Sequence, residues 1–479
     1  MNNPDGNITS FLAVKLTVKS VNKTAVLLVS AATLVVSMID ITAFNVALPQ
    51  MQAQLQASTG QLQWIVDIYM LVLAAFLLLM GSLGDRFGHK KALIAGIAVF
   101  AVGSIVGGLA TGPLLVILGR GIQAFGGALM PPVSLAIIND VYTDKAERAR
   151  AVGVWGSLMG IGMALGPLLG GFMVQYWSWR AVFWVNVPLA VVLIAVAARV
   201  VPEINPPKRT PFDWVGQLLA IATLGLLTFT IINAGETGWQ RWHIAPIVAV
   251  LLGLAAFIAT ELHVSHPMVE MRFLKSLPFS LTILDTSIGF FAYAGFLFIF
   301  SLYLQQERGL APSTAGLMMV PLAVLTSIFA AVSGRIVAAH GNRIPLLMYA
   351  IFLIVGALMA MQLGPSSSLL LPIAVAMIFG AAMGSINASA STAALAGMPR
   401  EKAGVAGALL STGRQTGQSL GVAVIGSGLN QGLQDGLSIS QAASSSWWLV
   451  IAIGVVCGVL AIVATGELAK RSQERIGSW

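Results

Sequence analysis

Long apolar runs separated by short polar segments constrain this chain more than any other feature of its sequence. A helix needs about 20 mostly apolar residues to cross a hydrocarbon core about 30 Å thick, and fourteen runs come close to or exceed that length. The chain is 57% hydrophobic and only 9% charged, whereas soluble domains carry about 25% charged residues. We therefore predict an all-α membrane protein with fourteen transmembrane helices. The runs are residues 25–48, 62–82, 92–110, 113–138, 151–174, 179–200, 214–233, 243–262, 278–304, 313–338, 345–363, 368–398, 403–432 and 446–468.

The distribution of lysine and arginine predicts the orientation of the chain. If the N-terminus lies in the cytoplasm, 21 of the 26 basic residues fall in segments on the cytoplasmic side. Three of them, Arg180, Arg241 and Arg308, fall on the outer side, and Arg120 and Arg414 fall within apolar runs. Cytoplasmic segments of membrane proteins carry such an excess of positive charge. We expect a multi-pass protein of the cell membrane, the cytoplasmic membrane of a bacterium, with both termini in the cytoplasm.

Charge and motif content argue against several classes of function. The net charge is +8, but the basic residues lie in short segments between apolar runs and not on one folded face, which argues against nucleic-acid binding. The phosphate-binding pattern G-x-x-x-x-G-K-[ST] is absent, which excludes ATP as the direct energy source. The single cysteine, Cys457, and the scattered histidines offer no metal cluster. We expect a protein that is not an enzyme and that holds neither a metal nor a cofactor.

One polar segment, GSLGDRFGHKKAL (81–93), is more strongly patterned than orientation alone requires. Its glycines permit a tight reversal and close helix approach, and its carboxylate can pair with arginines or cap an adjoining helix. A weaker echo without the acid, GRIVAAHGNR (334–343), begins 253 residues further along. This repetition predicts two related halves, as in many transporters. The residues that we assign to this gating loop are Gly81, Gly84, Asp85, Arg86, Gly88 and Lys90.

Five motifs in order make nearly the whole chain resemble the major facilitator superfamily, and within it the fourteen-span drug–proton antiporters. The gating loop resembles the superfamily's conserved segment between spans 2 and 3. MIDITAFNVALP (38–49) resembles the first-span signature of the drug-exporting branch, and RGIQAFGGALMPP (120–132) resembles the span-4 motif, with Ala124 in place of a glycine. GMALGPLLGG (162–171) and SWRAVFWVNVP (178–188) match the span-5 antiporter motif and the start of span 6.

The resemblance implies two six-helix bundles around a central cavity, with a helix pair inserted between them. It also implies a proton-coupled antiporter that exports amphiphilic, often cationic drugs by alternating access, and that functions as a monomer. Two alternatives stay open: a dedicated exporter of one metabolite or antibiotic, and a membrane receptor or enzyme without transport. The implied division is a tail at 1–24, a bundle at 25–200, a linker and inserted pair at 201–277, a bundle at 278–468 and a tail at 469–479. The antiporter-motif residues are Gly162, Gly166, Pro167, Gly170 and Gly171.

Ionisable residues inside the apolar runs are functional candidates, because an unpaired charge within the membrane is costly. Asp40, Asp67 and Arg120 fall at similar depths in the first, second and fourth runs. Arg120 favours the ionised form of Asp40, whereas burial favours its protonated form, so these three residues are candidates for proton coupling. The alternative is a permanent buried ion pair that only fixes helix packing. For Asp67, a hydrated position near the membrane surface is a further alternative.

The C-terminal half adds Asp285 and Arg414 within apolar runs. Asp285 either attracts a cationic substrate or pairs with a basic loop, and Arg414 lies either at a cavity or in small-residue packing. Aromatic side chains within the runs either line an adaptable cavity or face lipid and helix interfaces. Glu236 and Glu307 fall in outer loops, where we expect both to be solvated. The candidates for the substrate cavity are Asp285, Arg414, Gln123, Trp64 and Phe44.

Overall fold

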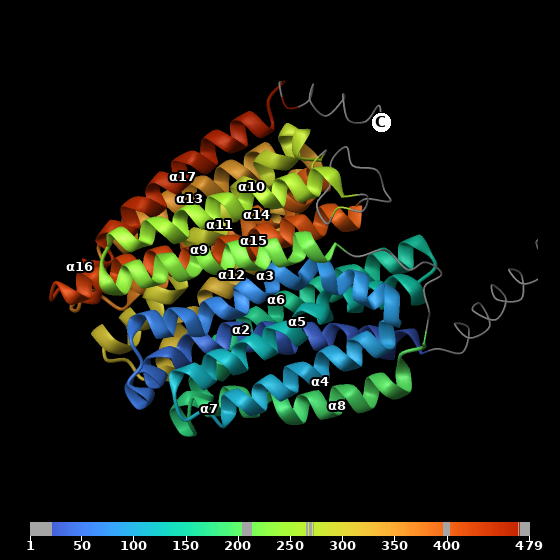
Figure 1. The fold of residues 1–479 in the computed structure, drawn as a ribbon, viewed down its shortest axis with the longest axis horizontal. Helices are drawn as coiled ribbons and strands as arrows, with labels where there is room; N and C mark the ends of the chain where they lie inside the picture. Colours follow the sequence, from blue (N-terminus) through green and yellow to red (C-terminus); the bar gives the residue numbers. More distant parts are fainter. Residues whose placement is uncertain are drawn as a thin grey trace, which may run out of the picture.

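The computed structural model is built from helices over the residues that it describes, which are 22–203, 213–264, 267, 271, 273–395, 403–467 and 469. The first six spans form an N-terminal bundle, and the last six form a C-terminal bundle that lies above it in Figure 1. The N-terminal bundle contains α2 (Lys23–Leu55), α3 (Thr59–Phe87), α4 (His89–Gly108), α5 (Pro113–Val141), α6 (Lys145–Tyr176), α7 (Arg180–Trp184) and α8 (Asn186–Val200). The C-terminal bundle contains α11 (Leu277–Leu302), η3 (Tyr303–Glu307), α12 (Pro312–His340), α13 (Arg343–Ala360), α14 (Leu370–Leu395), α15 (Ala403–Gln434), α16 (Ile439–Ala442) and α17 (Ser444–Ala464).

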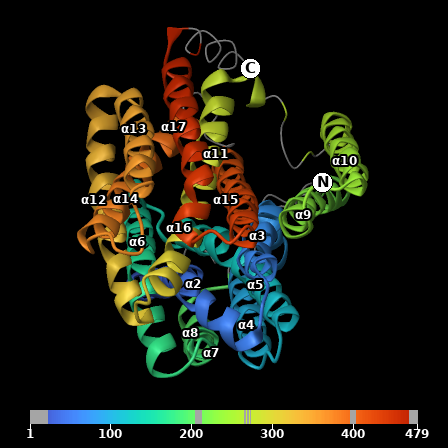
Figure 2. The same cartoon turned by 90° about the vertical axis from the view of Figure 1, so that its left-hand side faces the viewer.

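An inserted helix pair lies beside the two bundles. It consists of α9 (Trp214–Thr237), η1 (Arg241–His243) and α10 (Ile244–His263), and a short η2 (Phe273–Lys275) precedes α11. Figure 2 shows α9 next to α3 and α15, with α10 on its outer side. Only 11% of the most apolar window of α10 is buried within the protein. The pair is therefore attached to both bundles through α9, while α10 presents apolar side chains to its surroundings.

The same helix pairings recur in both bundles. In the N-terminal bundle α2 packs on α6, α3 on α5, and α4 on both α5 and α8. The corresponding pairs in the C-terminal bundle are α11 with α15, α12 with α14, and α13 with both α14 and α17. Between the bundles, α3 packs on α15 and α6 packs on α12. The second span of each half therefore contacts the fifth span of the other, as expected for two related halves.

Thirteen of the described helical segments are long and apolar enough to cross a membrane. Each coincides with one of the predicted runs. The remaining run, 403–432, forms the 32-residue helix α15, which is long enough but carries polar side chains such as Arg414, Gln415 and Gln418. Because α15 packs against α3, α9 and α11, these polar residues lie on a helix that is largely surrounded by other helices and not by lipid.

The polar segment at 81–93 is not the loop that the sequence predicts. Helix α3 continues to Phe87 and α4 begins at His89, so only Gly88 separates the two helices. Gly88 has a φ of 93°, in the left-handed region that favours glycine. Gly84 has a packing role instead, because a Cβ there would lie 2.9 Å from a side chain of α5. A single residue makes the reversal, and we call this end of the molecule the basic end.

Two acids at the opposite end, which we call the Ser58 end, make specific hydrogen bonds. Glu236, at the end of α9, accepts hydrogen bonds from the Ser58 hydroxyl and, at 3.1 Å, from the Gly60 amide. This position is the N-terminus of α3, where the helix dipole favours a carboxylate. Glu307 accepts from the amide and the hydroxyl of Ser440 at 2.6 and 2.5 Å. The prediction that both glutamates are simply solvated is therefore wrong.

Hydrogen bonds between the bundles hold the Ser58 end together. The Ser301 hydroxyl of α11 donates to the backbone carbonyl of Asn45 on α2. The next turn along the chain adds a bond from Gln305 Nε2 to the carbonyl of Val46 at 3.0 Å. Both acceptors are backbone carbonyls, so these bonds fix the position of α2 itself relative to the C-terminal bundle. The described conformation is therefore closed at the Ser58 end.

Candidate functional site

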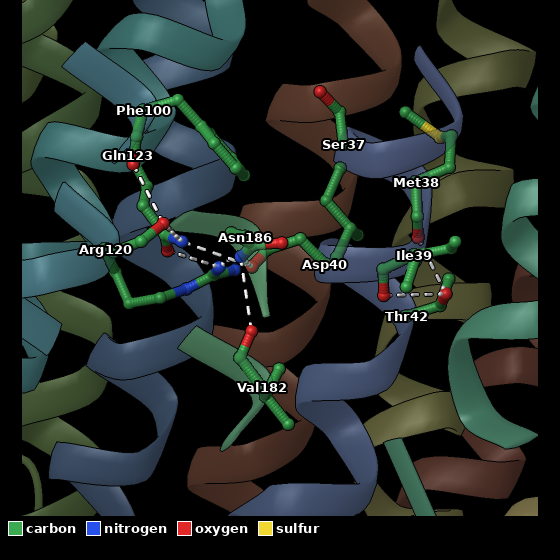
Figure 3. Close-up of polar contacts among 12 residues, drawn as sticks. Ser37, Met38, Ile39, Asp40, Thr42, Phe100, Arg120, Gln123, Val182 and Asn186 are labelled. Carbon is green, nitrogen blue, oxygen red and sulfur yellow. Dashed lines mark hydrogen bonds and ion pairs between the residues drawn. The ribbon is translucent and has the colours of Figure 1, made fainter. Parts of the chain in front are cut away.

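A buried ion pair lies within the N-terminal bundle. Asp40, near the middle of α2, and Arg120, on α5, are each 1% exposed. Arg120 Nη1 lies 2.6 Å from Asp40 Oδ2 (Figure 3). Opposite charges at this distance attract strongly in a water-poor interior, whereas either charge alone would carry a large desolvation cost. The structure thus brings together an acid and a guanidinium that the sequence places at similar depths.

Amide groups complete the surroundings of Asp40. Asn186 Nδ2, at the start of α8, donates to Asp40 Oδ1 at 2.7 Å, and Gln123 Nε2 donates to the same oxygen at 3.2 Å. Gln123 Oε1 accepts from Arg120 Nη1 at 3.1 Å, while its Nε2 also donates to Ser104 of α4 at 2.8 Å. Both carboxylate oxygens are therefore hydrogen-bonded, by donors on two helices. We call these five residues the Asp40 cluster.

Two aromatic rings enclose the guanidinium of this cluster. The Arg120 Cζ lies 4.0 Å from the ring centroid of Phe44 and 4.1 Å from that of Tyr69. Cation–π contacts of this kind contribute about 0.5–2 kcal/mol each. Phe44 is 1% exposed and Tyr69 is 0% exposed, so neither ring is available to line an open cavity in this conformation. Phe44, a predicted cavity residue, contacts the arginine instead.

Close packing of α4 on α5 brings Ser104 within reach of Gln123. A Cβ added to Gly119 of α5 would lie 2.6 Å from the backbone nitrogen of Gly107 on α4. A Cβ on Gly103 of α4 would overlap the backbone of Gln123. Small residues allow membrane helices to approach this closely. Gly119, which directly precedes the span-4 motif, and Gly103 of α4 therefore position the polar cluster.

Asn186 and Ser104 are absent from the predicted site. Asn186 could have been recognised from the sequence, because it is the one polar residue in the apolar stretch 181–197. Ser104 could not, because serine is a common packing residue between membrane helices. Burial of both side chains, at 1% and 0% exposed, shows that the cluster draws on α4 and α8 as well as on the predicted α2 and α5.

Asp67 lies on α3 and belongs to different surroundings. It is 0% exposed, and neither carboxylate oxygen has a hydrogen-bond partner among the described residues. One turn away, Gln63 Nε2 donates to the carbonyls of Val422 and Ala423 on α15 at 3.3 and 3.2 Å. Asp67 is therefore close to the contact between the bundles, and the hydrated position considered for it is not observed. Trp64, on the same helix, is half-buried.

The antiporter motif at 162–171 faces two different helices. Three of its glycines, spaced four residues apart, pack on α2, and a Cβ on any of them would lie within 3 Å of an atom of that helix. The other two motif residues face α12 of the opposite bundle, where the Pro167 carbonyl adjoins Gly316. Helix α6 thus contacts both the helix that carries Asp40 and the other bundle. The α2-facing residues are Gly162, Gly166 and Gly170, and the α12-facing residues are Pro167 and Gly171.

A small, mostly apolar cavity lies between the two bundles. Residues of α2, α6, α11 and α12 line it, among them Thr42, Met163, Tyr293 and Met319. It has room for about 10 Å³, roughly one water-sized sphere, and is therefore far smaller than the sites of about 300–1,000 Å³ that typically bind small molecules. Thr42 is two residues from Asp40 and so about 200° around the helix. Figure 3 accordingly shows Asp40 pointing toward Arg120 and Thr42 pointing to the other side of α2.

The residues predicted for the substrate cavity lie elsewhere in this conformation. None of the five lines the cavity between the bundles. Gln123 and Phe44 contact Arg120, and Trp64 is on α3. Asp285 is 2% exposed within the C-terminal bundle, and no ion pair joins it to a basic residue among the described residues. Tyr293, one of the aromatic residues within the runs, does line the cavity.

The predicted gating residues lie at the basic end. Arg86 is exposed at the end of α3, and Lys90 is half-buried in the first turn of α4. Between these helices and α5, His89 Nδ1 lies 2.6 Å from Asp140 Oδ2. The surroundings of Gly81 and the side chain of Asp85 lie outside what the structure describes. Charged groups therefore do gather at the Gly88 turn, but the contacts of Asp85 are not among those described.

Two related six-helix bundles with a cavity between them define a class of protein, the membrane transporters built from repeated halves. The chain belongs to the Major Facilitator Superfamily, whose family model matches residues 31–422. This match covers all six spans of the N-terminal bundle, the inserted pair, and the C-terminal bundle as far as α15.

Named relatives cover most of the chain. Multidrug resistance protein Stp of Mycobacterium tuberculosis is 32% identical over 409 residues, which are 85% of this chain and 76% of that one. Multidrug efflux pump LfrA of Mycolicibacterium smegmatis is 32% identical over 81% of this chain and 77% of its own. The tetracenomycin C resistance and export protein of Streptomyces glaucescens is 31% identical over 81% and 72%. The relatives are thus transporters and resistance proteins of bacteria.

Solved structures share the fold. A peptide transporter, POT, matches with a TM-score of 0.68 at 13% identity, over 94% of this chain and 95% of its own. A bacterial homologue of the lysosomal transporter Spinster, in an inward-facing conformation, matches with a TM-score of 0.67 at 18% identity, over 95% and 98%. At these identities the likeness establishes the arrangement of the helices alone.

Proposed function

We propose that this protein is a proton-coupled antiporter that exports amphiphilic, often cationic drugs by alternating access. The observation that carries the proposal is that the Asp40 cluster and the cavity between the bundles lie on opposite sides of α2. A proton on Asp40 changes the contacts on one side of the helix whose other side lines the cavity. Relatives named for multidrug resistance and multidrug efflux support drugs as the substrate class.

The ion pair supplies the proton switch. Protonation of Asp40 removes the charge that attracts Arg120 and converts one carboxylate oxygen from an acceptor into a donor. Arg120 keeps the Gln123 amide oxygen, at 3.1 Å, and the two aromatic rings as partners. The interaction between α2 and α5 therefore weakens when Asp40 is protonated, while Arg120 keeps favourable contacts with its other neighbours.

Helix α6 transmits a shift of α2 to the other bundle. The motif glycines bring α6 against α2 without intervening side chains, and Pro167 and Gly171 bring the same helix against α12. Pro167 also contributes to the lining of the cavity. The cavity, with room for about 10 Å³, has to widen before a drug-sized molecule enters. Since the Ser58 end is closed, substrate enters this conformation from the basic end.

The basic end faces the cytoplasm in this proposal. The excess of lysine and arginine in segments on that side supports the assignment, and with this orientation both termini lie in the cytoplasm of a bacterial cell. The gating residues, including Arg86 and Lys90, then govern the cytoplasmic opening. The protein works as a monomer, with a bundle at 25–200, the linker and inserted pair at 201–277 and a bundle at 278–468.

Cysteine accessibility tests the orientation. Ser366, between α13 and α14 at the Ser58 end, and His340, at the end of α12 at the basic end, are both exposed. In intact cells, an impermeant maleimide should label a Ser366→Cys variant and not a His340→Cys variant. The native Cys457 is 0% exposed, so the parent protein serves as the unlabelled control. Labelling of His340→Cys alone would reverse the proposed orientation.

Transport in inverted vesicles tests the function itself. With an acidic lumen, wild-type protein should accumulate ethidium and tetraphenylphosphonium, and a protonophore should abolish the accumulation. Empty-vector vesicles give the background. No uptake of any compound in a broad panel, with the protein present in the membrane, would refute drug–proton antiport. Uptake of one compound alone would instead support a dedicated exporter, a role consistent with the relative named for tetracenomycin C export.

A further inference from the structure

A buried carboxylate of the C-terminal bundle lies apart from both the Asp40 cluster and Asp67. Asp285 of α11 is 2% exposed, and neither of its carboxylate oxygens has a hydrogen-bond partner among the described residues. It lies eight residues after Leu277, where α11 begins at the basic end, and so about 12 Å along the helix. An ionised carboxylate without a cation or a donor is strongly unfavourable in such a position. Burial of this kind favours a neutral carboxyl group over a carboxylate.

Two further ionisable side chains adjoin Asp285 from two other helices. Cys457 of α17 is 0% exposed, and its Sγ lies 4.0 Å from the backbone carbonyl of Asp285. Tyr349 of α13 is also 0% exposed, and its hydroxyl occupies the space that a Cβ on Gly289 would need, one turn further along α11. That hydroxyl has no hydrogen-bond partner among the described residues. We call Asp285, Tyr349 and Cys457 the Asp285 cluster.

Among the described residues, no cation is paired with the acid of this cluster. Arg414, on the adjacent α15, lies 5.5 Å from the ring centroid of Phe290 and donates toward Asn387 at 3.4 Å, not to Asp285. Tyr349 and Cys457, both neutral hydrogen-bonding groups, are the ionisable neighbours of Asp285. The ionisable residues on the elements packed against α11 are Lys23 and Asp40 on α2, Lys275 on η2, Tyr303 and Glu307 on η3, Arg414 on α15 and Cys457 on α17, with none on α14.

The acid on the first span of each bundle thus has different interaction partners. Asp40 is held by a cation and by amide donors, whereas the neighbours of Asp285 among the described residues are neutral. Asp285 also lies nearer to the basic end, at the ninth position of α11, whereas Asp40 is at the eighteenth position of α2. A carboxyl group without a cation changes its charge when a conformational change admits water or aligns donors with it. Tyr349 and Cys457 can supply such donors.

We propose that the Asp285 cluster is a second proton-binding site, which exchanges its proton with water at the basic end once in each transport cycle. The ionised carboxylate then accepts hydrogen bonds from the Tyr349 hydroxyl and the Cys457 thiol. This proposal rests on the proposed antiport function and extends it to two protons per cycle. A purely structural Asp285 would instead keep its proton at every pH at which the protein is folded.

Infrared spectroscopy of the reconstituted protein tests the site without a substrate. The wild-type minus Asp285→Asn difference spectrum should contain the band of a protonated carboxyl group at about pH 6 that fades toward about pH 9. Tyr349→Phe should move this fading to a higher pH, because the ionised form loses a donor. Asp435→Asn, at an exposed acid of the same bundle, is the matched control and should leave the band unchanged. A difference band that is missing, or constant across this range, would overturn the proposal.

The coupling ratio gives a second, independent measurement. With the membrane potential clamped at zero, each coupled proton contributes about a tenfold limiting accumulation ratio per unit of pH gradient. At a gradient of about one pH unit, the limiting ethidium accumulation ratio should therefore be about hundredfold for the wild type and about tenfold for Asp285→Asn. The ratio for Asp435→Asn should match that of the wild type. Equal ratios in wild type and Asp285→Asn would refute the second proton and leave the antiport function intact. No accumulation by the wild type would count against the antiport function, and the infrared spectra would still decide the proton site.

Discussion

Replacing Asp40 by asparagine removes one charge from a fully buried pair and changes little else in volume. The wild-type carboxylate accepts from Arg120 at 2.6 Å, from Asn186 at 2.7 Å and from Gln123 at 3.2 Å. An asparagine offers one acceptor and one NH₂ group to these three donors. Whichever way its amide is turned, a donor then faces another donor. The substitution therefore leaves Arg120 without its counter-charge and at least one amide group poorly satisfied.

The expected loss of stability follows from these contacts. Removing one partner of a buried ion pair costs about 3–5 kcal/mol. A remaining hydrogen bond from Arg120 to the asparagine oxygen would return about 1.5–3 kcal/mol, and an unsatisfied buried amide would cost about 1–3 kcal/mol. These two effects nearly cancel, so Asp40→Asn should destabilise the protein by about 3–5 kcal/mol. Arg120→Gln should cost a similar amount, because it leaves a buried carboxylate without its cation.

A double-mutant cycle measures the pair directly. Equilibrium unfolding in mixed micelles of wild type, Asp40→Asn, Arg120→Gln and the double variant gives the coupling energy. We expect the double variant to be less destabilised than the sum of the single variants by about 2–3 kcal/mol, because it contains no unpaired charge. Asp435→Asn provides a baseline for a substitution at an exposed acid. A coupling energy near zero would refute the view that the two charges stabilise each other.

Transport by the same four proteins separates a proton switch from a permanent packing pair. If the pair only fixes helix packing, the double variant should recover both stability and gradient-driven efflux. If Asp40 exchanges protons, the double variant should recover stability and remain inactive, because an asparagine cannot take up or release a proton. Efflux by a well-folded double variant at the wild-type rate would end the claim that Asp40 is a proton carrier.

Two further substitutions test the packing that surrounds the switch. Gly166→Val should abolish transport, because even a Cβ at this position would overlap Thr42 on α2. The control variant Gly153→Val should transport normally, because a Cβ there would meet nothing within 4 Å. Equal transport activities of the two variants in vesicles would contradict the close-packing role of Gly166. Glu236→Gln should lower the free energy of unfolding by about 0.3–1 kcal/mol, because a neutral group interacts less with the N-terminus of α3. A loss as large as that expected for Asp40→Asn, or no loss at all, would contradict the helix-capping role of Glu236.

The position of each residue across the membrane could be predicted from the sequence. An apolar run must form a helix, because lipid offers no partners for backbone polar groups, and each residue of a helix advances it by about 1.5 Å. Asp40 and Arg120 could therefore be placed at one depth, and their 2.6 Å contact bears this out. The glycines at 162, 166 and 170 are spaced four residues apart and so lie on one face of a helix, which is the face that α6 presents to α2.

The sequence could not reveal which way each side chain points within its layer. That direction depends on which helices are neighbours, and neighbours such as α2 and α8 are about 150 residues apart in the chain. No local sequence pattern predicts the hydrogen bond of 2.7 Å between Asn186 and Asp40. Asp67 lies at a depth similar to that of Asp40, but its surroundings are different, near the contact with α15.

The depth of each residue in the membrane was thus determined by the sequence alone, because the length of a membrane helix and the rise per residue are local properties. The direction in which each side chain points was decided by the tertiary structure, because it arises from packing between distant segments. The same division explains the errors at Glu236 and Glu307, whose partners lie 176 and 133 residues away. It also explains why the cavity is lined by Thr42, Met163 and Tyr293 and not by the charged residues that the sequence suggested.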